Sequence, residues 1–230
     1  MKSRLNDLFT NPSITIKKDR PILFLSDLHM GGGGPADNFV QNEKIVLDNI
    51  NLYVKEGFLI VITGDGEELW QFTKKEIDKA HQDIITLFAQ LKGMGRLIEL
   101  EGNHNKGIGL PESLLIDGEN PILVIHGHQG DFINDKWWRV GRFFTRYIWK
   151  YIEVLGIKDP TSASKNLKKH DLVRKMHNEW ANRLEIPLVY GHTHFQEQCG
   201  YAWNVGGGIT PGRVDIIELN DKGLRLSAWR

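Results

Sequence analysis

The sequence has few of the features that mark exported or membrane-spanning proteins. Cys199 is the only cysteine among 230 residues, so the chain can form no internal disulfide and no thiolate cluster. The longest apolar runs, such as residues 58–62, are far shorter than the roughly 20 residues that cross a bilayer. The first 20 residues lack the continuous apolar core of a signal peptide. These absences predict a cytoplasmic chain that spans no membrane.

An excess of charge of one sign is also missing, because 29 Lys and Arg balance 29 Asp and Glu. Proteins that bind nucleic acid usually carry a basic excess, so this balance gives no general support for such a function. The charge is nevertheless segregated along the chain. Residues 132–186 hold twelve Lys and Arg against six Asp and Glu, a net charge of +6, and the remainder carries −6.

The remaining composition, 40% apolar and 25% charged, is that of an ordinary globular protein. Short apolar runs that end in polar or glycine residues predict buried strands over residues 21–26, 58–63, 96–100, 121–125 and 186–190. Helical spacing over 38–55 and 74–91 completes a β-α-β layout, and two turn-flanked pairs of runs later in the chain predict antiparallel pairing. We expect a single α/β domain, residues 1–230, with a mixed sheet or two sheets.

The basic segment 132–186 predicts a helical insert, with two helices broken near residues 156–160. Its first helix carries an apolar stripe between Trp137 and Leu155, and this spacing is typical of a buried helix face. A second stripe of basic side chains could hold a diphosphate or contact an anionic membrane surface. We expect at least one of three arginines in it to bind substrate: Arg139, Arg142 and Arg146.

Side chains that can bind a metal ion follow each of the five predicted strands. Loops at the carboxyl ends of strands converge on one crevice in an α/β sheet, so these residues can share one site. Imidazole, carboxylate and amide groups without thiolate suit Mn, Fe, Zn, Co or Ni. They are too many for one ion, which predicts two divalent ions about 3.5–4 Å apart, as in enzymes that displace groups at phosphorus. The segments are Asp27-Leu-His29, Gly64-Asp65, Gly102-Asn-His104, His126-Gly-His128 and Gly191-His-Thr-His194.

These five segments, in this order, resemble the motifs of the calcineurin-like metallophosphoesterases. The resemblance implies a four-layer α/β/β/α sandwich of two mixed sheets and hydrolysis of phosphoester or phosphoanhydride bonds by a metal-bridging hydroxide. It also implies two metal ions, with manganese expected. In this reading the first ion is held by Asp27, His29 and His194, the second by Asn103, His126 and His192, and Asp65 bridges the two.

The same resemblance gives His104 a catalytic role, in which it stabilises the transition state or protonates the leaving group. The residue after it is Asn105, where the family has an acidic side chain. An amide can orient an imidazole but cannot stabilise its charged form, so another group, such as His128 or Asp131, could assist. Glu68 fits the last position of the family's G-D-x-x-D/E motif, and we expect it to lie outside the ligand set. His128 could alternatively contact substrate or be a simple loop residue.

A helical insert before the last histidine motif resembles that of the UDP-2,3-diacylglucosamine hydrolases, in which it forms a cap over a lipid substrate. This predicts a phosphate-containing small molecule or a lipid-linked nucleotide diphosphate as substrate, with peripheral membrane contact through the insert. Two departures, His104 and the Phe195 that follows His194, allow a relative with another substrate. A metal-dependent nuclease or phosphodiesterase and a non-catalytic metal-binding module are the alternatives. The sequence does not indicate the oligomeric state.

Overall fold

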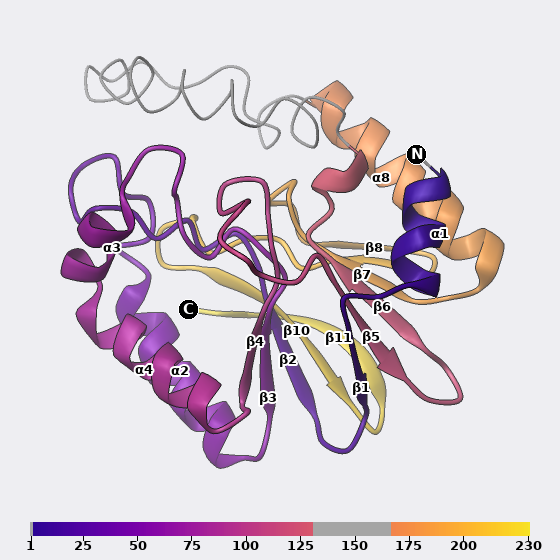
Figure 1. Ribbon diagram of the computed structural model, residues 1–230, viewed down its shortest axis with the longest axis horizontal. Helices are drawn as coiled ribbons and strands as arrows, with labels where there is room; N and C mark the ends of the chain where they lie inside the picture. The colour runs from indigo at the N-terminus through magenta and orange to yellow at the C-terminus, as the bar shows by residue number, and fades with distance from the viewer. Residues whose placement is uncertain (1, 131–166) are drawn as a thin grey trace.

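Two β-sheets packed face to face form the centre of the protein, as the computed structural model shows for residues 2–130 and 167–230 (Figure 1). The five-stranded sheet has the order β11-β10-β2-β3-β4, and the six-stranded sheet has the order β1-β5-β6-β7-β9-β8. Both sheets are mixed: β2, β3 and β4 are parallel while β10 is antiparallel to β2, and β6, β7 and β9 are parallel while β5 is antiparallel to β6.

The strands of the five-stranded sheet are β2 (Ile22–Leu25), β3 (Leu59–Ile62), β4 (Leu97–Glu99), β10 (Val214–Asn220) and β11 (Gly223–Trp229). Those of the six-stranded sheet are β1 (Ile14–Lys17), β5 (Ser113–Asp117), β6 (Ile122–Ile125), β7 (Leu188–Tyr190), β8 (Glu197–Cys199) and β9 (Ala202–Asn204). The described helices are α1 (Lys2–Thr10), α2 (Glu43–Lys55), α3 (Lys74–Ala80), α4 (Gln82–Gly93), α8 (Leu167–Leu184) and the short 3₁₀ helix η1 (His128–Gly130).

Three apolar clusters hold four layers together. In β2, Ile22 and Phe24 point into the cluster between the sheets, while Leu23 and Leu25 face the helices α2, α3 and α4. The alternation of a strand explains this division, because successive side chains lie on opposite faces. The third cluster joins the outer face of the six-stranded sheet to α1 and α8. The order helices, sheet, sheet, helices confirms the predicted α/β/β/α class.

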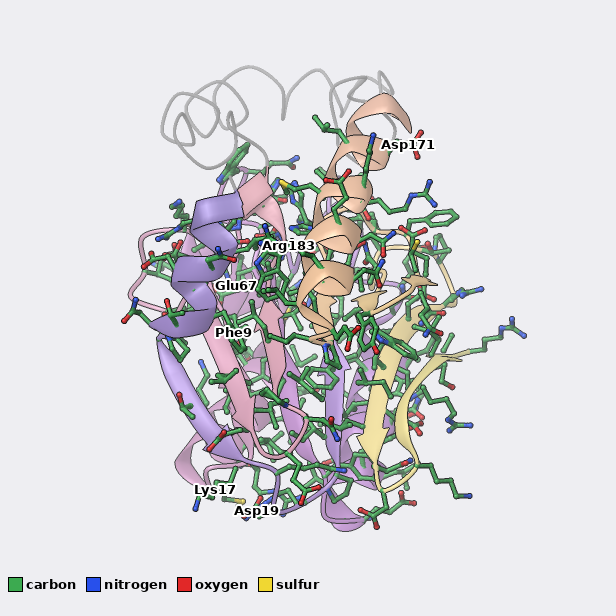
Figure 2. The ribbon with its side chains drawn as sticks, turned by 90° about the vertical axis from the view of Figure 1, so that its right-hand side faces the viewer. Phe9, Lys17, Asp19, Glu67, Asp171 and Arg183 are labelled. Carbon is green, nitrogen blue, oxygen red and sulfur yellow. The ribbon has the colours of Figure 1, made fainter. Side chains whose placement is uncertain are left out.

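Helix α8 lies within the range predicted for the insert. Its residues Val173, Met176 and Trp180 are buried, and the Trp180 ring packs edge-on against Phe9 of α1 at 6.0 Å between centroids. Figure 2 shows α1 and α8 side by side over the sheet. The first predicted insert helix and the three arginines at 139, 142 and 146 lie outside the described residues, so a cap-like insert stays a prediction. No helix in residues 2–130 or 167–230 is long and apolar enough to cross a membrane.

The predicted helix over 74–91 is two helices, broken at His81. The side chain of Thr73 caps α3 through a capping box with Glu76, so the first helix begins as its sequence dictates. His81 leaves the helical region, with φ −121° and ψ 43°, and its buried ring lies between Asp37 (2.7 Å) and Glu43 (3.1 Å). Two carboxylates from the preceding loop and helix thus fix the imidazole where the helix bends. The spacing of apolar residues, from which one continuous helix was predicted, does not reveal such a polar contact.

Candidate metal centre

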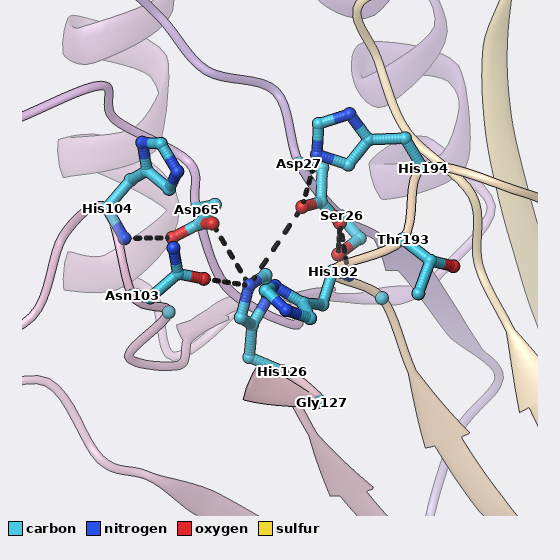
Figure 3. A network of polar contacts seen from close by, with 12 residues as sticks. Ser26, Asp27, Asp65, Asn103, His104, His126, Gly127, His192, Thr193 and His194 are labelled. Carbon is cyan, nitrogen blue, oxygen red and sulfur yellow. Dashed lines mark hydrogen bonds and ion pairs between the residues drawn. The ribbon is translucent and has the colours of Figure 1, made fainter. Parts of the chain in front are cut away.

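The loops that follow β2, β3, β4, β6 and β7 meet at one edge of the paired sheets, as the strand-end motifs predict (Figure 3). Six non-glycine residues among those described have a positive φ, and five of them are predicted ligands. Their φ angles run from 49° to 73°, the left-handed region that ordinary side chains rarely adopt. Such residues cluster at functional sites, where the surrounding fold compensates for the backbone strain. The five are Asp27, His29, Asp65, His192 and His194.

The first group of ligand atoms comes from both sheets. Asp27 and His29 follow β2, and His194 comes from the loop after β7. Asp27 Oδ1 lies 3.1 Å from His194 Nε2 and 3.7 Å from His29 Nε2, and these two ring nitrogens are 3.1 Å apart. The other oxygen of Asp27 accepts a hydrogen bond from the backbone N–H of His192 at 2.9 Å, which turns Oδ1 toward the imidazoles.

The second group lies directly beside the first. His126 Nε2 is 3.0 Å from Asp65 Oδ2 and 3.2 Å from Asn103 Oδ1, and it is 4.0 Å from Asp27 Oδ1 of the first group. Asp65, His126 and His192 each offer a ligand atom within 4.8 Å of the others. Asp65 is held as Asp27 is, since its Oδ1 accepts from the backbone N–H of His104 at 2.7 Å. The two groups contain the residues that the motifs assign to two neighbouring ions.

The chemistry of the donors fits divalent metal ions. Asp27 Oδ1 is buried and accepts no hydrogen bond, although two imidazole nitrogens lie within 3.7 Å of it. A buried carboxylate oxygen left without a donor is costly, and a cation would satisfy it. Burial alone would raise the pKa of Asp27, but the charges of His194 and His126 hold this pKa well below its usual range. The same balance, with His126 and His104, lowers the pKa of Asp65, so both carboxylates are anionic.

The catalytic candidate His104 has a carboxylate partner, and this partner is Glu68. Glu68 lies 2.7 Å from His104 Nδ1 and 2.8 Å from His29 Nδ1. Burial would raise the pKa of Glu68, but the charges and hydrogen bonds of the two histidines lower it to about 2. These three residues could also form a metal-binding group. Because His29 turns its Nε2 to the first group, its Nδ1 carries the proton, and we interpret the contact as a hydrogen bond.

Asn105, which stands where the family motif has an acidic residue, stabilises the turn of the motif. Its Oδ1 accepts from the backbone N–H of Gly102 at 2.6 Å and closes the turn that carries Asn103 and His104. The group that accompanies His104 is therefore the carboxylate of Glu68, whose sequence position already suggested a place outside the ligand set. Asp131, the other residue considered for this task, lies outside the described residues.

His128 lies behind the second group rather than at its surface. The side chain is fully buried, its ring centroid is 5.5 Å from that of His126, and neither ring nitrogen has a hydrogen-bond partner. Burial, followed by the charge of His126, lowers the pKa of His128 well below its usual value and keeps the ring neutral. A contact between His128 and substrate stays a prediction.

Comparison with known proteins agrees with the motifs. The chain is 25% identical over 130 residues to UDP-2,3-diacylglucosamine hydrolase of Ralstonia nicotianae, a match that covers 49% of this chain and 45% of the relative. The chain thus spans less than half the length of the curated relative that it matches. No family model matches the chain.

Solved structures of similar arrangement include proteins of several kinds. A dimetal phosphatase from Danio rerio is 9% identical, with coverage of 91% of this chain and 95% of that one and a TM-score of 0.47. The calcineurin-like phosphoesterase YfkN of Bacillus subtilis is 12% identical (91% and 88%, TM-score 0.41), and a Vps29 mutant of Entamoeba histolytica is 16% identical (91% and 98%, TM-score 0.43). In its five strand-end motifs, the protein is similar to calcineurin-like metallophosphoesterases.

Proposed function

We propose that this protein is a metallophosphoesterase that hydrolyses phosphoester or phosphoanhydride bonds with two divalent metal ions. The observation that carries the proposal is the pair of adjacent Asp/His groups at the sheet edge, with Asp27 Oδ1 3.1 Å from His194 Nε2 and 4.0 Å from His126 Nε2. Two groups this close favour a dinuclear centre over two independent structural sites. Ligands without thiolate agree with manganese, which is the ion we expect first.

In this proposal, Asp27, His29 and His194 hold one ion, Asn103, His126 and His192 hold the other, and Asp65 bridges them. Two divalent ions at this place would polarise the phosphoryl oxygens and lower the pKa of the water that attacks phosphorus. The protein's own contribution is orientation. Backbone N–H groups of His192 and His104 each hold one oxygen of an aspartate, at 2.9 and 2.7 Å, and leave the other oxygen for the centre.

His104 is the residue that we assign to the leaving group. Its side chain is 24% exposed, more than those of Asp27, Asp65 and His126, which are at most 1% exposed. Because Nδ1 is engaged by Glu68, the nitrogen that remains for a substrate oxygen is Nε2. A proton held at Nε2 would neutralise the departing alkoxide or phosphate. The carboxylate of Glu68 holds the imidazole of His104 through Nδ1, whereas Asn105 binds the backbone of Gly102 instead.

For the substrate, we propose a lipid-linked nucleotide diphosphate, such as the one named in the UDP-2,3-diacylglucosamine hydrolase of Ralstonia nicotianae. The net charge of +6 on residues 132–186 supports this choice, because arginines can bind a diphosphate through paired hydrogen bonds. In this reading Arg139, Arg142 and Arg146 contact substrate, and the insert touches the membrane surface that holds the lipid.

The test of the proposed function is hydrolysis by the metal-stripped protein after reconstitution. The purified chain would be loaded separately with Mn²⁺, Zn²⁺ and Mg²⁺ and offered bis-p-nitrophenyl phosphate, p-nitrophenyl phosphate, single-stranded DNA and UDP-2,3-diacylglucosamine. We expect metal-dependent turnover, with the nucleotide lipid as the best substrate. Preference for DNA would support the nuclease alternative. A protein that binds metal ions and hydrolyses none of the four would support a binding module.

Replacement of Glu68 by Gln should slow the reaction without weakening substrate binding. The amide keeps the size of the side chain but removes the charge that lies 2.7 Å from His104. We expect kcat to fall by about 10- to 100-fold, as for other residues that support a site from outside. The loss should be larger for alkyl than for p-nitrophenyl leaving groups, since only poor leaving groups need a proton.

Glu67→Gln is the matched control, because Glu67 pairs with Lys74 instead. Equal losses for both leaving groups would contradict the role.

A further inference from the structure

Trp70 contacts both Asn103 and His104 of the Gly102-Asn-His104 motif. Its indole ring stacks on the imidazole of His104, with centroids 4.4 Å apart and planes 21° from parallel. Its Nε1–H donates to the backbone carbonyl of Asn103 at 2.6 Å. The side chain is only 8% exposed, so it is buried against the motif. Sequence position alone does not distinguish this tryptophan, because a buried aromatic residue is most often part of a core.

The two contacts control different degrees of freedom. A hydrogen bond from Nδ1 to Glu68 fixes one atom of the His104 ring but allows the ring to turn about that bond. The nearly parallel indole restrains the plane of the ring, and a second, T-shaped contact with His29 lies at 4.7 Å between centroids. Together the three neighbours restrict the orientation of Nε2.

The hydrogen bond from Trp70 holds the backbone of Asn103. The carbonyl that accepts it belongs to Asn103, whose side-chain oxygen faces His126 Nε2 at 3.2 Å. Buried carbonyl groups need a partner, and here the partner is supplied by the segment that also carries Asp65 and Glu68. One stretch of six residues, 65–70, therefore holds the motif by three separate side chains.

We propose that Trp70 is a positioning residue, which keeps the His104 ring and the Asn103 peptide in register with the metal centre. This inference rests on the proposed function, because it assigns Trp70 a part in that reaction. Correct orientation of a reacting group is worth much in rate, and a displacement of about 1 Å can cost 10²-fold. Trp70 should accordingly affect kcat far more than KM, since its own side chain is only 8% exposed and acts through His104 and Asn103.

The test is a double-mutant cycle between Trp70 and His104. Trp70→Leu should lower kcat by roughly 10- to 100-fold with KM within about twofold of wild type. In a His104→Gln background the same replacement should have a clearly smaller effect, because one of the two groups that it positions is gone and only the contact with the Asn103 peptide remains. Trp70→Phe keeps an aromatic ring on His104 but loses the N–H donor, so it should restore much of the loss. Trp229→Leu is the control for the removal of a buried indole, since Trp229 packs in the helix-covered core.

The inference is overturned if Trp70→Leu lowers kcat equally in both backgrounds, or no more than Trp229→Leu does. If the metal-loaded wild type hydrolyses no phosphoester, the proposed function is wrong. The positioning of the His104 ring by Trp70 can then still be tested by NMR of the imidazole signals. The wild type should then give one sharp set of His104 signals, shifted by the ring current of Trp70. These signals should lose that shift and broaden in Trp70→Leu. Unchanged signals would refute the positioning role.

Discussion

Replacement of Asp65 by Asn should abolish phosphoester hydrolysis while leaving the fold intact. The amide preserves the acceptor for the His104 backbone N–H but removes the negative charge beside His126. Because the proposed bridging ligand is lost, we expect kcat to fall by about 10³-fold or more and metal content to drop from two ions to one or fewer. The measurements are hydrolysis of bis-p-nitrophenyl phosphate and elemental analysis of the dialysed protein.

Glu67→Gln makes the same chemical change two residues away and serves as the control. Its carboxylate forms an ion pair with Lys74 at 3.0 Å and belongs to none of the candidate metal groups found among the described residues. This variant should keep both its metal ions and its kcat. An Asp65→Asn protein that retained two ions and a normal rate would show that the centre lies elsewhere.

Gly191→Ala should damage the site through a single added methyl group. A Cβ atom at this position would collide with Ser26 Oγ and come within 2.5 Å of Asp27 Oδ2. The strand β7 ends here against the end of β2, so neither neighbour can withdraw without moving Asp27. Overpacking of this kind costs ~1–3 kcal/mol, and we expect lower thermal stability together with metal affinity reduced by at least about 10-fold.

Two further variants separate this collision from a general effect of alanine. Gly118→Ala introduces the same methyl group in the turn between β5 and β6, where nothing lies within 4 Å, and should be neutral. Ser26→Ala combined with Gly191→Ala removes the oxygen atom that the methyl group meets, and should recover part of the metal affinity. If Gly191→Ala binds metal as wild type does, the packing between these two strand ends is looser than the structure indicates.

Most of the sheet could be predicted from the sequence, because the buried strands are short continuous apolar runs. The run at 58–63 became β3 (Leu59–Ile62), and the turn signal at 117–120 became the antiparallel connection of β5 and β6. The edge strand β1 (Ile14–Lys17) and the three-residue strands β8 and β9 were not predicted, because they are too short or too polar to form a recognisable apolar run. Their place depends on neighbours that are distant in the sequence.

The metal groups could be predicted for a different reason. Their residues follow strands, and strand ends meet in space whatever the length of chain between them. The supporting contacts could not be predicted in this way. Glu68 contacts both His29 and His104, and Trp70 stacks on His104. These contacts depend on side-chain rotamers and loop conformations, which the spacing of residues in the sequence does not reveal. The predicted substrate contacts at 139, 142 and 146 remain predictions.

The division of the ligands between the two sheets has a consequence for the lifetime of the folded chain. Asp27 and His29 leave the five-stranded sheet and His194 the six-stranded one, and Asp65 faces His126 across the same boundary. Ions bound as proposed would be cross-links between two layers whose facing sides otherwise meet in an apolar cluster and a few hydrogen bonds, such as that from His192 N–H to Asp27. Their binding energy would add to the resistance against separation of the sheets, by mass action with free metal. Scarcity of the ion would thus shorten the survival of the protein as well as stop its chemistry.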